Sequence, residues 1–130
     1  MPPTEPLPDR LANPWAKYFL ATRPAFLSVT FVGSLVGLAT AFADGVPIDF
    51  LKAVLTVFFA LVAHAGANVV NDYYDALNGS DAANEERIFP FTGGSRFIQN
   101  GVLSLNQTRW LGFALLISVI PAGLWLTAHS

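Results

Sequence analysis

The chain has 130 residues, of which 53% are apolar and only 12% are charged, against roughly 25% charged residues in a typical soluble domain. Its net charge is −2, and no basic face indicates a nucleic-acid partner. There is no cysteine, which excludes disulfide frameworks, thiolate metal sites and cysteine nucleophiles.

The opening segment, residues 1–13, is predicted to be a disordered tail. It is rich in proline and lacks the apolar run that a cleavable signal peptide requires. From Pro14 onward, aromatic residues are mixed with Lys17 and Arg23. This mixture is typical of a short helix that lies at the lipid headgroups and leads into the first membrane span.

Three stretches have no charged residue and are long enough to cross a bilayer as helices: residues 24–43, 53–70 and 110–128. Helices satisfy their own backbone hydrogen bonds, as lipid requires, whereas the core helices of a soluble bundle normally carry a polar stripe facing water. The predicted fold class is therefore all-α, a polytopic membrane helical bundle. Its three transmembrane helices lie in a lipid bilayer, within a domain that covers residues 14–130.

Positively charged residues predict the orientation of these helices. Three precede the first span, Lys52 alone lies in the first loop, and three lie in the second loop. This alternation predicts that the amino terminus and the second loop are cytoplasmic, and that the first loop lies on the other side of the membrane.

Three local features predict packing and helix ends. Gly33 and Gly37 form a GxxxG pair that would let another helix approach closely. Pro121 is expected to kink the third helix, because it removes a backbone hydrogen bond. Ser104 and Gln107 fit a capping box, which would start that helix before its apolar stretch.

Polar residues gather at the cytoplasmic end of the second span, in the run HAGANVVNDYYDALNGSD over residues 64–81. On a helix that advances about 100° per residue, five of them fall within about one third of the circumference. These are His64, Asn68, Asn71, Asp72 and Asp75. The second helix is accordingly predicted to continue to about residue 78.

Carboxylates at membrane depth cost at least ~2.5 kcal/mol at the bilayer centre and less near the interface, so this stripe needs a compensating charge. Mg²⁺ prefers oxygen ligands, and Asn71 and Asp75, one turn apart, can present two of them to one ion. Gly79 and its neighbours are expected to end the helix, so that Asp81 can turn back toward the ion. An ordinary solvated helix end also contains Asn and Asp, but attachment to an apolar span favours the metal site.

His64 lies nearly two turns deeper in the membrane. A hydrogen bond to another helix is its predicted role, and a proton acceptor lining a cavity is the alternative.

The run NVVNDYYDALNGSD, followed by FTGGSRFIQNGVLS, resembles the first aspartate-rich region and following loop of the UbiA prenyltransferase superfamily. The spacing NDxxDxxxGxD is most similar to the MenA branch, which prenylates 1,4-dihydroxy-2-naphthoate on the way to menaquinone. Enzymes that prenylate 4-hydroxybenzoate would have an aspartate at the position of Gly79, whereas here the carboxylate comes two residues later, at Asp81. The resemblance extends from Arg23 to about Ser104.

This resemblance implies the roles of particular residues. Mg²⁺ is the expected cofactor, and a polyprenyl diphosphate and an aromatic acceptor are the expected partners. The expected metal ligands are Asn71, Asp75 and Asp81, and the expected catalytic residues are Asp75, Asp72 and Asp81. The expected diphosphate-binding residues are Asn68, Arg87 and Arg96, although both arginines also fit simple positive-inside residues facing headgroup phosphates.

The family has eight or nine transmembrane helices and a second aspartate-rich motif in its later half. This chain has three spans and no second motif, so on its own it is expected to be inactive, with the remainder supplied downstream in the gene or by another chain. The expected location is the bacterial cytoplasmic membrane. Prenylation of 4-hydroxybenzoate, a transporter, and a non-catalytic membrane protein of the same fold remain alternatives.

Overall fold

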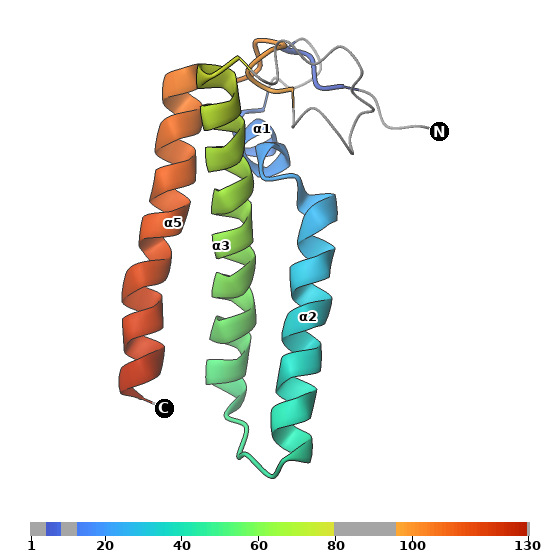
Figure 1. The fold of residues 1–130 in the computed structure, drawn as a ribbon, viewed down its shortest axis with the longest axis vertical. Coiled ribbons are helices and arrows are strands. Elements are labelled where there is room, and N and C mark those ends of the chain that lie inside the picture. Colours follow the sequence, from blue (N-terminus) through green and yellow to red (C-terminus); the bar gives the residue numbers. More distant parts are fainter. Residues whose placement is uncertain (1–4, 9–12, 80–95, 130) are drawn as a thin grey trace.

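The computed structural model describes residues 5–8, 13–79 and 96–129. These form a short helix, α1 (Pro14–Ala21), and three long helices, α2 (Pro24–Ala43), α3 (Phe50–Leu77) and α5 (Leu105–Ala128). Figure 1 shows the three long helices side by side with α3 in the middle, and α1 lying across one end of the bundle. The predicted all-α class and its three long apolar helices are confirmed.

Each long helix is long and apolar enough to cross a membrane. At a rise of 1.5 Å per residue, the 28 residues of α3 extend about 42 Å, beyond the roughly 30 Å hydrocarbon core. The extra turns lie at the carboxyl end, where the polar residues are. The helix therefore carries its polar stripe toward the edge of the bilayer instead of ending within it.

The start of α5 is fixed by the predicted capping box. The Gln107 amide donates to the Ser104 hydroxyl at 3.1 Å, and the Ser104 amide donates to the Gln107 side chain at 3.0 Å. Two of the amides that a helix start leaves unpaired are thereby satisfied. The helix accordingly begins at Leu105, ahead of its uncharged stretch.

Two glycines set the close packing of α3 against α5. A methyl group added at Gly112 would lie 2.7 Å from a methyl carbon of Val70 and 3.1 Å from the Val70 backbone nitrogen, and one added at Gly66 would lie 2.9 Å from Leu116. By contrast, a methyl group added at Gly33 or Gly37 would meet no described neighbour within 4 Å. Within the described residues, the close helix contact therefore lies between α3 and α5, and the predicted GxxxG face of α2 is open.

A small apolar cluster joins α1 to the segment before α5. It is formed by Ala21, Phe97, Val102 and Leu103, with Tyr18 and Leu111 packed against it. The cluster fixes α1 at the end of the bundle where α3 finishes, while Trp15 and Phe19 on the same short helix stay exposed. This amphipathic arrangement suits a helix at the headgroups.

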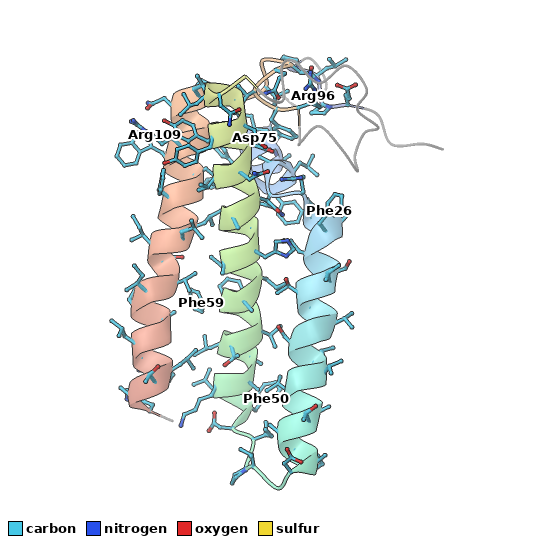
Figure 2. The ribbon with its side chains drawn as sticks, in the orientation of Figure 1. Phe26, Phe50, Phe59, Asp75, Arg96 and Arg109 are labelled. Atoms are coloured by element: carbon cyan, nitrogen blue, oxygen red, sulfur yellow. The ribbon has the colours of Figure 1, made fainter. Side chains whose placement is uncertain are left out.

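The two ends of the bundle differ in charge. Figure 2 shows Asp75, Arg96 and Arg109 at the end that carries α1, and Phe50 at the other end. Near Phe50, Lys52 donates a hydrogen bond to the carbonyl of His129. The described arginines therefore gather at one end, as the alternation of positive residues predicts.

Candidate functional site

The carboxyl end of α3 holds four of the predicted site residues. Asp72 is buried, Asn68 and Asp75 are partly buried, and Asn71 is exposed. Asn78 caps the helix and Gly79 follows in the left-handed conformation with φ of 78°, which ends the helix where the sequence predicts. Asp81 and Arg87 lie outside the described residues, so their predicted roles stay predictions.

Asp72 is only 5% exposed and has a cationic neighbour on another element. Its Oδ1 lies 3.5 Å from Nη2 of Arg23, the residue that links α1 to α2. A carboxylate buried at the edge of a membrane needs such compensation, because an uncompensated buried charge is costly. Part of the charge that the polar stripe carries is thus balanced within the chain.

Asn68 is tied to the same linker. Its side-chain amide donates to the carbonyl of Thr22 at 2.8 Å, while Arg23 Nη2 donates to the Asn68 backbone carbonyl at 3.4 Å. The side chain of Asn68, a residue predicted to bind diphosphate, therefore contacts the carboxyl end of α1 in this structure.

Arg96 is buried and has a left-handed backbone with φ of 65°. Its Nε lies 3.6 Å from a carboxylate oxygen of Glu5, and Asn100 donates to the carbonyl of Pro6 at 2.8 Å. Glu5 and Pro6, in the tail that is predicted to be disordered, thus contact the segment before α5. Residues 1–4 and 9–12 lie outside the described part of the chain. Arg96 is held at the same end of the bundle as Asp75 (Figure 2).

His64 lies in the middle of the α2–α3 interface. Its Nδ1 is 2.7 Å from the hydroxyl of Thr30. The predicted hydrogen bond to another helix is therefore present, and it joins α3 to α2 within the apolar span.

The side chains at this end of α3 that could bind a cation are oxygen donors. Asn71 and Asp75 are about 40° apart around α3, one turn from each other, and both lie beyond the most apolar part of the span. Among the described residues, no group of three His, Cys, Asp or Glu side chains is close enough to hold a metal ion. The donors present fit one part of a Mg²⁺ site, which needs one or two carboxylates and leaves the other positions to water and phosphate.

Arg23 lies at the candidate site, although the sequence analysis did not predict it as a site residue. The sequence marks it only as one of several positive residues before the first span. A signal was available, because a carboxylate in a membrane span usually pairs with a cation at the same depth, and Arg23 and Asp72 both lie at the ends of predicted spans that the sequence assigns to the same side of the membrane.

Comparison with known proteins relates this chain to proteins of the UbiA prenyltransferase type. It is 39% identical over 113 residues to the UbiA prenyltransferase domain-containing protein 1 homolog of Drosophila melanogaster, a match that covers 81% of this chain and 30% of the relative. It is 32% identical over 106 residues to the 1,4-dihydroxy-2-naphthoate octaprenyltransferase of Escherichia coli K12, covering 82% of this chain and 32% of that enzyme. The chain is homologous to UbiA-type prenyltransferases.

A third UbiA-type relative, the UbiA prenyltransferase domain-containing protein 1 of Dictyostelium discoideum, is 39% identical over 62 residues, 48% of this chain and 19% of the relative. The chain thus spans about a third or less of the length of these UbiA-type relatives. No family model matches the chain, and no solved structure gives a significant match.

Proposed function

We propose that this chain provides the first aspartate-rich region of a prenyltransferase that moves a polyprenyl group from an allylic diphosphate to an aromatic quinone precursor. The observation that carries the proposal is the polar end of α3. An otherwise apolar, membrane-length helix ends in Asn71, Asp72 and Asp75, within a chain whose relatives are prenyltransferases.

In this proposal Asn71 and Asp75, with Asp81, would hold Mg²⁺. When bound, the ion would neutralise the negative charge that develops on the diphosphate leaving group. The oxygen donors of Asn71 and Asp75 are of the kind that hard cations such as Mg²⁺ prefer. Asp72 lies on the flank of this face, against Arg23.

The rest of the chain would position the substrate. Arg96, at the same end of the bundle, and Arg87 would donate charge-assisted hydrogen bonds to diphosphate oxygens. The polyprenyl tail would extend along the apolar helices toward lipid, where its transfer from water is favourable. The aromatic ring would then attack the allylic carbon at the boundary between the polar end and the span. A carbon–carbon bond would form as the carbon–oxygen bond to diphosphate breaks, and the attacked ring carbon would lose its proton or carboxyl group to restore the aromatic ring.

The acceptor we propose is 1,4-dihydroxy-2-naphthoate, which makes the pathway menaquinone biosynthesis. The spacing that places Gly79 and Asp81 after Asp75 resembles the MenA branch, and one relative is named for this reaction. 4-Hydroxybenzoate is the alternative acceptor. We place the protein in the bacterial cytoplasmic membrane with the polar end of α3 facing the cytosol, because the arginines gather at that end.

A transfer assay of the purified full-length protein tests this function. We expect Mg²⁺-dependent prenylation of dihydroxynaphthoate, with hydroxybenzoate a poorer acceptor when the two are offered side by side. Chelation of divalent cations should abolish product formation, and added Mg²⁺ should restore it. Absence of transfer to either acceptor in the presence of Mg²⁺ and a polyprenyl diphosphate would contradict the proposal.

A further inference from the structure

Arg23 adopts a backbone conformation that needs support from its surroundings. Its φ and ψ are 54° and 64°, in the left-handed region, and Pro24 follows it as the first residue of α2. A residue with a Cβ pays roughly 1–2 kcal/mol for this conformation, so its persistence requires favourable contacts elsewhere. The contacts of Arg23 are with the end of α3, with Leu20 of α1 and with Phe26 of α2.

Thr22 and Arg23, which link α1 to α2, both contact α3, and each side donates a hydrogen bond to the other. Arg23 reaches the Asp72 carboxylate at 3.5 Å and the Asn68 carbonyl at 3.4 Å, and the Asn68 side chain returns to Thr22 at 2.8 Å. The Arg23 guanidinium also lies over the ring of Phe26, with 5.9 Å to the ring centroid. The corner between α1 and α2 is therefore connected to one defined face of α3.

That face is the flank of the candidate metal site. Around α3, Asp72 is about 60° from Asp75, and Asn71 is about 40° from Asp75 on the other side. The Asp72 side chain is 6% exposed and that of Arg23 is 19% exposed, so the pair is largely shielded from water. A rotation of α3 that moved Asn71 and Asp75 would have to break this pair.

We propose that Arg23 is a positioning residue for the site of the proposed function. By balancing the charge of Asp72 and holding Asn68, it fixes the direction in which Asn71 and Asp75 face. Asp72 then serves as the counter-ion of Arg23, and Asp75 is the carboxylate that contacts the cation and diphosphate. This inference rests on the proposed function for the role of Asn71 and Asp75, but the pairing itself does not.

A double-mutant cycle in the full-length protein tests the pairing. Arg23→Ala removes the guanidinium beside the buried Asp72 carboxylate, and we expect it to lower the melting temperature and to reduce kcat/KM for prenyl transfer about tenfold or more. Neutralising the carboxylate as well, in Arg23→Ala with Asp72→Asn, should recover part of both losses. The melting temperature and kcat/KM of Arg23→Lys should lie between those of wild type and Arg23→Ala, because lysine keeps the charge but lacks the planar guanidinium with its several N–H donors.

Two comparisons make the result specific. Arg109→Ala removes an exposed arginine at the same end whose side chain bonds to Asn106 at 2.9 Å, and it should leave melting temperature and transfer unchanged. Asp72→Asn should retain more activity than Asp75→Asn. The Arg23→Ala loss should appear in kcat together with a higher Mg²⁺ requirement, because a displaced ligand set weakens cation binding.

The proposal is overturned if the double variant is no better than Arg23→Ala in both melting temperature and transfer, or if Asp72→Asn is as inactive as Asp75→Asn. It is also overturned if Arg23→Ala raises only the KM for the diphosphate with an unchanged melting temperature, because that pattern indicates direct contact with substrate. Failure of the proposed function would look different. The wild-type protein would transfer no prenyl group, while the melting temperatures would still report whether Arg23 and Asp72 are coupled.

Discussion

Asp72 and Asp75 stand three residues apart on α3 but have different surroundings. Asp72 is buried beside the Arg23 guanidinium, whereas Asp75 is partly exposed at the polar end. The sequence presents both as acids of one motif, since the helical spacing that places them on one stripe says nothing about which of them meets a cation from another helix. The structure separates their environments, and this separation underlies the different roles that we propose for them.

The hydrogen bond between His64 and Thr30 is a second polar contact within the apolar region. Thr30→Val removes the hydroxyl with little change in shape, and we expect the free energy of unfolding to fall by about 0.6 kcal/mol, with an upper value near ~1.7 kcal/mol for such bonds between membrane helices. The measurement is the melting temperature of the full-length protein in detergent.

Thr40→Val is the matched control for that change. The Thr40 hydroxyl bonds to Val36 of its own helix at 2.9 Å and is exposed, so its loss removes no contact between helices. Equal melting temperatures for the two variants would show that the His64 bond does not stabilise the packing of α2 on α3.

At the scale of elements, the α3–α5 interface depends on the missing side chain of Gly112. A methyl group there would approach the Val70 backbone nitrogen at 3.1 Å as well as the Val70 side chain, and backbone cannot move aside as a flexible side chain can. We expect Gly112→Ala to destabilise the protein by about 1–3 kcal/mol, measured by thermal unfolding.

Gly123→Ala, in the same helix, provides the comparison. No described neighbour lies within 4 Å of a methyl group there, so the gain in helix propensity of up to ~1 kcal/mol should leave stability equal or higher. If Gly112→Ala were as stable as Gly123→Ala, the close approach of the two helices would be refuted.

The elements also show which features can be read from sequence. The capping box of Ser104 and Gln107, and the helix end at Asn78 and Gly79, depend on residues within four positions of one another, and both were predicted. By contrast, the contact between Arg23 and the end of α3 joins residues about 45 apart in the chain. A local sequence pattern cannot predict which loop will contact a buried acidic residue. The GxxxG pattern shows a related limit, because it identifies small residues on α2 but not whether a partner helix is present.

For the whole molecule, hydrophobic length predicts three spans, and the described residues contain three helices that suit them. The orientation of the helices in the membrane remains a prediction. Labelling of single introduced cysteines can test it, because this chain has no cysteine of its own. A cysteine at exposed Val46, in the turn between α2 and α3, should react with a membrane-impermeant maleimide added to intact cells. A cysteine at Leu105, at the other end, should react only after permeabilisation, and the reverse labelling would contradict the cytoplasmic placement of the polar end.

Binding of a cation and a diphosphate at the end of α3 is central to the proposed function. The most direct test is binding of a labelled polyprenyl diphosphate to the full-length protein with and without Mg²⁺, for wild type, Asp75→Asn and Asp49→Asn. Asp49 lies at the opposite end of the same helix, where its side chain caps the Lys52 amide at 2.9 Å, and Asn also caps helices well. We predict Mg²⁺-dependent binding in wild type and Asp49→Asn and its loss in Asp75→Asn, whereas equal Mg²⁺-dependent binding in all three, or none in wild type, would contradict the account.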